Sequence, residues 1–137
     1  MQFHVGMGQA NVNATDMPFP KTIGDQPSYK GVTYQAFSSL CGPCQLASGA
    51  PDTELVNGPF VTAIGKKYGK SAAQVSLKWV VQQGIPVLPK SSRRDYQLEN
   101  IDLFDWELSE EDMTALTAHA TPAVAGDAEG SGDCPIP

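Results

Sequence analysis

The chain has 137 residues, of which 41% are hydrophobic and 18% charged, and its formal net charge is −6. These values are ordinary for one water-soluble globular domain, and no apolar run approaches the roughly 18 residues that span a bilayer. The acidic charge and the lack of a basic stripe interleaved with aromatic residues disfavour a nucleic-acid partner. We expect no targeting signal, because Met1 leads directly into strand-like residues; the compartment stays open.

The charges are segregated along the chain. Between positions 66 and 94 there are seven of the nine basic residues and no acid, whereas eleven acids and no base occur from Asp95 to the end. The basic residues of this block are Lys66, Lys67, Lys70, Lys78, Lys90, Arg93 and Arg94. Two interpretations are open for the first four lysines: they lie on solvated helix faces, or they create a positive field that steers a phosphorylated ligand toward Lys90.

The first third of the chain predicts two strands separated by a loop. Residues 2–5 alternate polar and apolar side chains, as the end of a strand does. Residues 6–30 are rich in Gly, Asn, Asp and Pro, which predicts an irregular loop. Residues 31–37 begin with Gly and continue with β-branched and aromatic residues, so they predict a buried strand.

A Cys-Gly-Pro-Cys motif follows at Cys41 to Cys44, and a third cysteine, Cys134, lies near the end of the chain. Such a pair has one thiolate of low pKa when it opens a helix after a strand. No Trp precedes Cys41, however, and residues 45–57 are predicted to be a loop. Dithiol redox catalysis is therefore disfavoured, and the cysteines are left as free thiols or as members of a disulfide.

Two helices are predicted in the middle of the chain. Asn57 is the expected N-cap of the first, with Pro59 in its first turn and Gly69 at its end. The second begins with a capping box at Ser71 to Gln74 and stops at Gly84. Its expected apolar face consists of Ala73, Leu77, Val80 and Val81, with Val75 and Trp79 beside it.

The next stretch predicts a strand, a cationic turn and a helix. Residues 85–88 form a short apolar run between Gly84 and Pro89, which is typical of a buried strand in a parallel sheet. The turn contains Lys90, Ser91, Ser92, Arg93 and Arg94, and an amphipathic stretch with Leu98 and Ile101 follows it. Cations, hydroxyls and free N–H groups at the start of a helix bind anions, so we expect a phosphate here.

A last helix is predicted from Ser109, with acidic residues in its first turn where the helix dipole favours them. Met113, Leu116 and Ala120 are expected to face the core, and the acids are interpreted as capping residues. Residues 121–137 are rich in Gly, Ser, Pro and Asp, which indicates a mobile or wrapped tail.

Several motifs recur in order in one known family. Val87 to Ser91 (Val-Leu-Pro-Lys-Ser), the Glu99-Asn100 pair, residues 104–109 (Phe-Asp-Trp-Glu-Leu-Ser) and residues 67–79 together resemble the last third of an NADP-dependent aldo-keto reductase. The resemblance implies an α/β fold, here a partial (half) TIM-type (β/α) barrel with about three parallel strands over residues 1–120, followed by the tail 121–137.

The resemblance also implies a cofactor site. Lys90 and Ser91 would hold the adenosine 2′-phosphate of NADP, and Glu99 and Asn100 would contact the adenine. Phe37 would stack on the nicotinamide, although plain core packing is the alternative for its ring, and the backbone of Ser38 to Leu40 would pass along the pyrophosphate. The family has an Arg where this chain has Tyr96, which weakens the implied preference for NADP; Arg94 is the nearby residue that would reach the phosphate instead. The full set of cofactor-binding candidates is Phe37, Ser38, Leu40, Lys90, Ser91, Ser92, Arg94, Glu99 and Asn100.

Other implications concern what the chain lacks. Aligned on His4, the chain would begin inside a strand of the family, so Met1 is expected to be internal to a longer parent or the start of a truncated gene. The family's catalytic Asp, Tyr, Lys and His have no counterpart, since Tyr34, Tyr68 and Tyr96 match other positions. We therefore expect no reductase activity from the isolated chain.

Two functions follow from the resemblance. The chain is either the NADP-clamping part of a reductase whose remainder comes from elsewhere, or a non-catalytic accessory subunit docked on a larger assembly. Both require a protein partner. Because the family's tail folds over the barrel face that carries the loop after the seventh strand, a disulfide from Cys134 to Cys41 or Cys44 is a further possibility that the resemblance implies.

Overall fold

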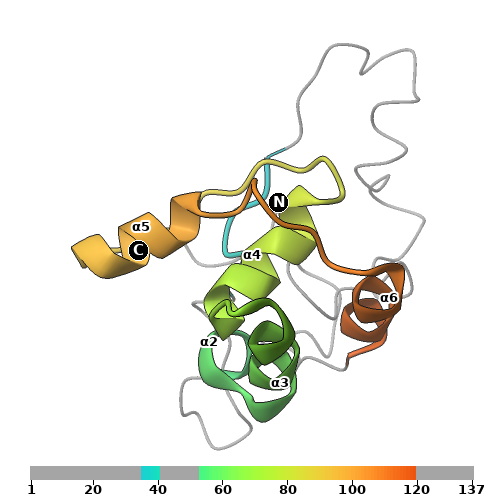
Figure 1. The fold of residues 1–137 in the computed structure, drawn as a ribbon. Coiled ribbons are helices and arrows are strands. Elements are labelled where there is room, and N and C mark those ends of the chain that lie inside the picture. The colour runs from blue at the N-terminus through green and yellow to red at the C-terminus, as the bar shows by residue number, and fades with distance from the viewer. Residues whose placement is uncertain (1–34, 41–52, 120–137) are drawn as a thin grey trace, which may run out of the picture.

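The computed structural model describes residues 35–40 and 53–119, and helices make up most of them. The described helices are α2 (Glu54–Asn57), α3 (Pro59–Tyr68), α4 (Ala72–Val81), α5 (Arg94–Ile101) and α6 (Glu110–Ala118). Helix α4 runs through the middle of this region, α2 and α3 cover one end of it, and α5 and α6 lie on opposite sides (Figure 1). None of these helices is long and apolar enough to cross a membrane.

Local signals set the C-terminal end of α3 and the start of α4, as predicted from the sequence. Gly69 ends α3 in the left-handed conformation, with φ of 65°. Ser71 caps α4 through the expected capping box with Gln74. The predicted N-cap of α3 is wrong, because Gly58 occupies that place and Asn57 is the last residue of α2. Helix α2 itself lies in a segment that we expected to be a loop.

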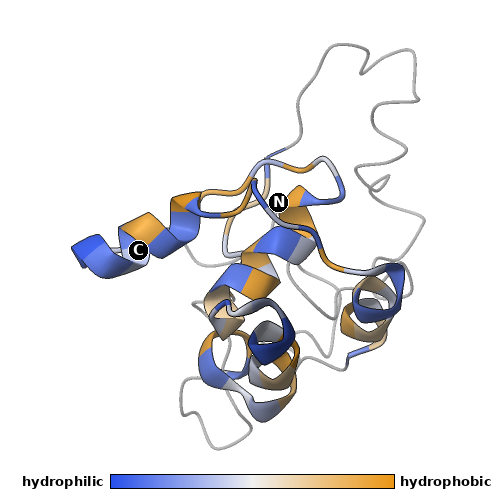
Figure 2. Cartoon of the chain, in the orientation of Figure 1, coloured by the Kyte–Doolittle hydropathy of each residue, from blue (hydrophilic) through white to orange (hydrophobic). Residues whose placement is uncertain are grey.

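Helix α4 is the core of the described region, and it is buried on nearly all sides. Val75, Leu77 and Val80 are fully buried, but so are polar residues of the same helix. Ser76 Oγ, for example, donates a hydrogen bond to the Leu55 carbonyl of α2 over 2.8 Å. The predicted single apolar face is therefore too narrow. Figure 2 shows hydrophilic and hydrophobic residues mixed along α4, which fits a helix that has neighbours all round.

The strand predicted at residues 85–88 is only partly confirmed. Ala36 and Val87 form an isolated parallel bridge, supported by a 2.8 Å hydrogen bond from Ala36 N–H to the Pro86 carbonyl. Within the described residues no longer strand is present. Ile85 is buried, but Leu88 is 57% exposed, so this segment is not buried on both faces as expected. Helix α4 ends at Val81, before the expected stop, and Gly84 lies in the following turn with φ of 80°.

Helices α5 and α6 attach to this core in different ways. Helix α6 begins at the predicted cap, where Ser109 Oγ accepts from the Asp112 N–H group, and Leu116 is fully buried as expected. Helix α5 has no buried residue, and Leu98 and Ile101 are 46% and 67% exposed, so the prediction of an amphipathic stretch is wrong for this helix. In Figure 1 this helix extends away from the other helices.

Several predictions lie outside the described residues. These are the strand end at 2–5, the loop at 6–30, the start of the strand at 31–37, the orientation of Ala120 and the tail at 121–137. The three cysteines, Cys41, Cys44 and Cys134, also lie there, as does Tyr34. Their interpretations remain predictions.

Candidate functional site

The parallel bridge places the two candidate cofactor segments at one edge of the fold. Because Ala36 and Val87 pair in parallel, the residues that follow each of them leave the bridge at the same end. Those residues are 37–40 on one side and the cationic turn 90–94 on the other. In parallel α/β folds, ligands bind at the carboxyl ends of strands. The geometry therefore brings the two predicted segments to the kind of edge where a ligand would bind.

Internal hydrogen bonds shape the cationic turn. Ser91 Oγ accepts from the Arg93 N–H group over 3.1 Å, and the Gln97 side chain donates to the Ser91 carbonyl over 2.8 Å. These bonds tie the turn to the first part of α5, whose N-cap is Arg93. The predicted turn and helix are thus present after the bridge residue Val87, although no full strand precedes them, and Ser91 has a structural role in the turn.

The cations of this turn differ in their surroundings. Lys90 and Arg94 are exposed, and within residues 35–40 and 53–119 neither side chain makes a hydrogen bond or ion pair. The guanidinium of Arg93 instead lies 4.3 Å from the centre of the Tyr96 ring and donates to the Tyr96 hydroxyl over 3.1 Å. Lys90 and Arg94 are therefore available to an anion, while Arg93 is stacked on the residue that replaces the family's Arg.

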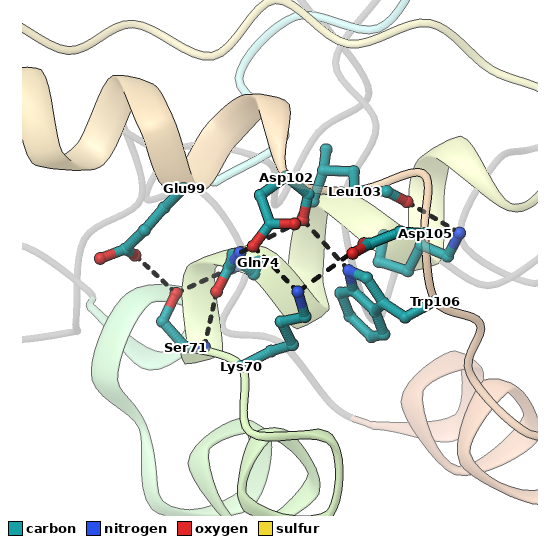
Figure 3. Close-up of polar contacts among 9 residues, drawn as sticks. Lys70, Ser71, Gln74, Glu99, Asp102, Leu103, Asp105 and Trp106 are labelled. Atoms are coloured by element: carbon teal, nitrogen blue, oxygen red, sulfur yellow. Dashed lines mark hydrogen bonds and ion pairs between the residues drawn. The ribbon is translucent and has the colours of Figure 1, made fainter.

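The two residues predicted to contact adenine, Glu99 and Asn100, have different surroundings. Glu99 Oε2 accepts a hydrogen bond from Ser71 Oγ over 2.8 Å, as Figure 3 shows. Asn100 lines a groove beside α5, and its side chain makes no hydrogen bond within the described part of the chain. Neither residue is buried.

Residues 37–40 carry two unusual features. Ser38 has φ of 52°, a left-handed conformation that is rare outside glycine. Within the described residues the hydroxyl of Ser39 is buried and has no hydrogen-bond partner, which is uncommon for a buried polar group and costs stability unless a partner is supplied. The Phe37 ring is 39% exposed, so it is not packed in the core.

The lysines of α3 and α4 are mostly used within the fold. Lys67 Nζ lies 2.6 Å from Asp112 Oδ1, and Lys70 Nζ lies 2.9 Å from Asp102 Oδ2. Lys78 is buried and donates to the Leu103 carbonyl over 2.9 Å. A solvated helix face therefore holds for Lys66 and Lys67, which are exposed on α3, and it is the wrong interpretation for Lys70 and Lys78.

The two acids in these pairs have altered acidities. The hydrogen bond from Lys70, followed by that from Gln74, lowers the pKa of Asp102. Burial opposes ionisation of Asp112, but hydrogen bonds from Lys67 and Tyr68 outweigh it and lower the pKa of that carboxyl. Sequence analysis missed both acids as partners, although the separate basic and acidic blocks were a signal that such pairs could form.

An apolar groove of about 570 Å³ lies between α5 and the segment after α4. Phe104 at its rim is 78% exposed, and Ile101 and Val87 also line it. The remaining lining residues are Val81, Gly84, Ile85, Pro86, Pro89, Gln97, Asn100 and Leu103. Sequence analysis did not predict this groove. Within the described residues no group of His, Cys, Asp and Glu side chains could hold a metal ion.

Comparison with known proteins identifies the family. A model described as the aldo/keto reductase family matches residues 52–121, just over half of the chain. The chain belongs to this family. It is 35% identical over 98 residues to a glyoxal reductase of Bacillus subtilis, which covers 72% of the chain and 32% of that protein. The predicted resemblance is therefore confirmed.

Solved structures share the fold of this chain. The aldose reductase of Schistosoma japonicum matches 89% of the chain and 33% of its own length, with a TM-score of 0.62 and 25% identity. Gox0644, solved in complex with NADPH, has the same fold over 74% of the chain, with a TM-score of 0.55 and 24% identity. The chain thus spans about a third of the length of these aldo/keto reductases.

Proposed function

We propose that this chain is the NADP-binding part of an aldo-keto reductase and that Lys90 and Arg94 bind the 2′-phosphate of the cofactor. The observation that carries the proposal is the parallel bridge between Ala36 and Val87, because it brings the residues of both candidate segments to one edge of the fold. Lys90 and Arg94 make no hydrogen bond or ion pair among the described residues. Gox0644, a protein of the same fold, was solved with NADPH.

The residues at this edge suit the chemistry of a dinucleotide. Two unpaired cations and the Ser92 hydroxyl match a phosphate. Among the described residues the buried Ser39 hydroxyl has no hydrogen-bond partner, so it has a proton to donate to a ligand oxygen. The exposed Phe37 ring offers a face for an aromatic base. When bound, NADPH would supply a hydride; the residues of this chain would bind and orient the cofactor.

We further propose that this chain alone does not reduce carbonyls, and the two described tyrosines support this. Reduction needs an acid that delivers a proton to the developing alkoxide. The Tyr68 hydroxyl donates to Asp112 over 2.6 Å and accepts from the Ser109 N–H group over 3.0 Å. The Tyr96 hydroxyl accepts from Arg93. Both described tyrosines are therefore used in the structure rather than presented to a substrate.

Isothermal titration calorimetry of the chain with NADPH and with NADH tests the phosphate site. Replacing Lys90 and Arg94 together by Gln should weaken NADPH binding roughly tenfold or more, since hydrogen bonds between charged groups are among the strongest in proteins. Binding of NADH, which has no 2′-phosphate, should change little. Lys66→Gln is the matched control, because it removes an exposed positive charge elsewhere. Equal loss for both cofactors, or no saturable binding of NADPH, would contradict the proposal.

The apolar groove supports a protein partner for this chain. We propose that the remainder of an aldo-keto reductase barrel covers it, because the chain spans about a third of its relatives and the groove includes Val87, the residue of the bridge. Large exposed apolar side chains such as Phe104 are typical of interaction surfaces. The alternative is a non-catalytic accessory subunit docked on a larger assembly, for which the same groove would be the attachment surface.

A mixing experiment separates these two functions. The chain is combined with the first two thirds of a related reductase, and sedimentation velocity and NADPH-dependent carbonyl reduction are measured. Association with activity supports the cofactor-binding part of a reductase. Association without activity supports an accessory subunit, and the absence of association rejects the remainder of the barrel as the partner. Phe104→Ser should weaken association, whereas Leu98→Ser, on an exposed residue of α5 outside the groove lining, is the matched control.

A further inference from the structure

Polar contacts, rather than buried apolar side chains, hold the second half of α5. No residue of this helix is buried. Glu99 contacts Ser71, and Asp102, the C-cap of α5, contacts both Lys70 and Gln74 (Figure 3). These three partners lie at the start of α4 and just before it. The position of Glu99 is therefore set from the N-terminal end of α4.

Ser71 makes two contacts through a single hydroxyl group. Its oxygen accepts from the Gln74 N–H group over 3.2 Å, which caps α4, and its hydrogen is donated to Glu99 Oε2 over 2.8 Å. The cap contact thus fixes the side chain that directs Glu99. The other carboxylate oxygen, Glu99 Oε1, has no hydrogen bond within the described residues. An ionised carboxylate only accepts hydrogen bonds, so this oxygen suits an N–H donor.

We propose that Ser71 is a positioning residue that orients Glu99 so that its second oxygen accepts a hydrogen bond from the exocyclic amine of the cofactor's adenine. This inference rests on the proposed NADP-binding function. Glu99 lies on the exposed helix α5, so without the Ser71 contact its flexible side chain would sample several rotamers. A fixed carboxylate loses less conformational entropy when the ligand binds, which is the physical advantage of the contact.

The test compares Ser71→Asp with Ser71→Thr in the full chain. Asp is a good N-cap and still accepts from the Gln74 N–H group, but it cannot donate to Glu99 and repels it. Thr retains both the acceptor and the donor. The probes are NADPH and its analogue in which hypoxanthine replaces adenine, so that a carbonyl oxygen stands in place of the amine. Dissociation constants are measured by calorimetry, and helix content by circular dichroism.

The expected result is a change in discrimination between the two probes. The unmodified chain and Ser71→Thr should bind NADPH roughly tenfold more tightly than the analogue, whereas Ser71→Asp should bind both about equally. If Ser71→Asp retains the same discrimination, Ser71 does not position Glu99, and only this inference fails. If the unmodified chain shows no saturable binding of NADPH, the proposed function fails and this inference fails with it.

A second variant leaves the cap of α4 intact and covers the case in which Ser71→Asp does not fold. In Glu99→Gln, Ser71 would hold the amide oxygen and direct the amide nitrogen toward the ligand. This variant should bind the analogue more tightly than NADPH. The amide N–H group can donate to the carbonyl of the analogue, whereas it would face the N–H groups of the adenine amine in NADPH. Unchanged preference for NADPH in this variant would overturn the proposal.

Discussion

Asp112 connects α6 to α3, and its replacement by Asn should destabilise the chain measurably. Its carboxylate accepts from Lys67 Nζ and the Tyr68 hydroxyl, each over 2.6 Å, and from Ser109 Oγ over 3.2 Å. The Asp112 side chain is only 6% exposed, so an amide nitrogen placed there would face a donor. Asn cannot accept from both Lys67 and Tyr68 without turning its NH₂ group toward one of them.

The expected cost follows from these contacts. A part-buried hydrogen bond to a charged group, such as that from the Tyr68 hydroxyl, contributes about 1.5–3 kcal/mol, whereas the Lys67 contact adds little because that side chain is 56% exposed. We expect Asp112→Asn to lower the free energy of unfolding by about 2 kcal/mol, or the midpoint of thermal unfolding by about 8 °C. Thermal and urea unfolding followed by circular dichroism measure it. Glu110→Gln is the matched control, since it removes a negative charge from the same helical turn without these contacts.

The difference in the free energy of unfolding between Asp112→Asn and the unmodified chain should depend on pH. The pKa of Asp112 is lowered in the folded chain relative to the ordinary value of 3.8, so the unfolded chain binds the proton first as the pH falls. The stabilisation is therefore complete above about pH 5 and is lost as the pH falls through 3.8 toward the lowered value. The reasoning would be refuted if Asp112→Asn lowered the free energy of unfolding by less than about 0.5 kcal/mol at pH 7. It would also be refuted if the decrease were equal at pH 7 and pH 2.5.

Three further predictions concern other contacts. Gly65→Ala should lower the free energy of unfolding by about 2 kcal/mol, because the added Cβ would lie so close to the Lys70 carbonyl that the backbone must shift. Gly69→Ala is the comparison: φ is 65° there and the space is open, so urea unfolding should show a decrease of only about 1 kcal/mol. Asp102→Asn should increase amide hydrogen exchange in α5 but not in α6, because it weakens the contacts with Lys70 and Gln74. Uniform exchange across both helices would contradict that view. Phe104→Ser should leave the unfolding midpoint within about 2 °C, since its ring is 78% exposed, and a larger drop would show that the ring packs in the isolated chain.

Signals that act over a few residues were predicted correctly from the sequence. The capping box at Ser71 and Gln74, the left-handed end of α3 at Gly69 and the cap at Ser109 each depend on residues within one turn. The N-cap of α3 was missed because two caps compete there. Gly58 takes the extended conformation before Pro59, which lets Asn57 remain in the preceding helix.

Features that depend on distant residues could not be predicted in this way. Residues 85–88 have the composition of a buried strand, but burial needs neighbours on both sides, and the described pairing is limited to the bridge with Ala36. Likewise Lys78 is 25 positions from Leu103, whose carbonyl accepts its hydrogen bond. No local pattern contains that contact. The candidate cofactor residues came from the family resemblance. The structure adds two observations: the two candidate segments lie at one edge of the fold, and Glu99 accepts a hydrogen bond from Ser71.

The segregated charges can now be connected with the proposed site. The basic and acidic blocks pair with each other at Lys67–Asp112 and Lys70–Asp102, which draws the second half of the described region onto α3 and α4. This pairing reduces the positive field of those lysines, so they are poor candidates for steering a ligand. Lys90 and Arg94, from the same basic block, have no such partner among the described residues. Among the described residues, Lys90 and Arg94 therefore leave two positive charges unpaired at the cationic turn, where the proposed phosphate would bind.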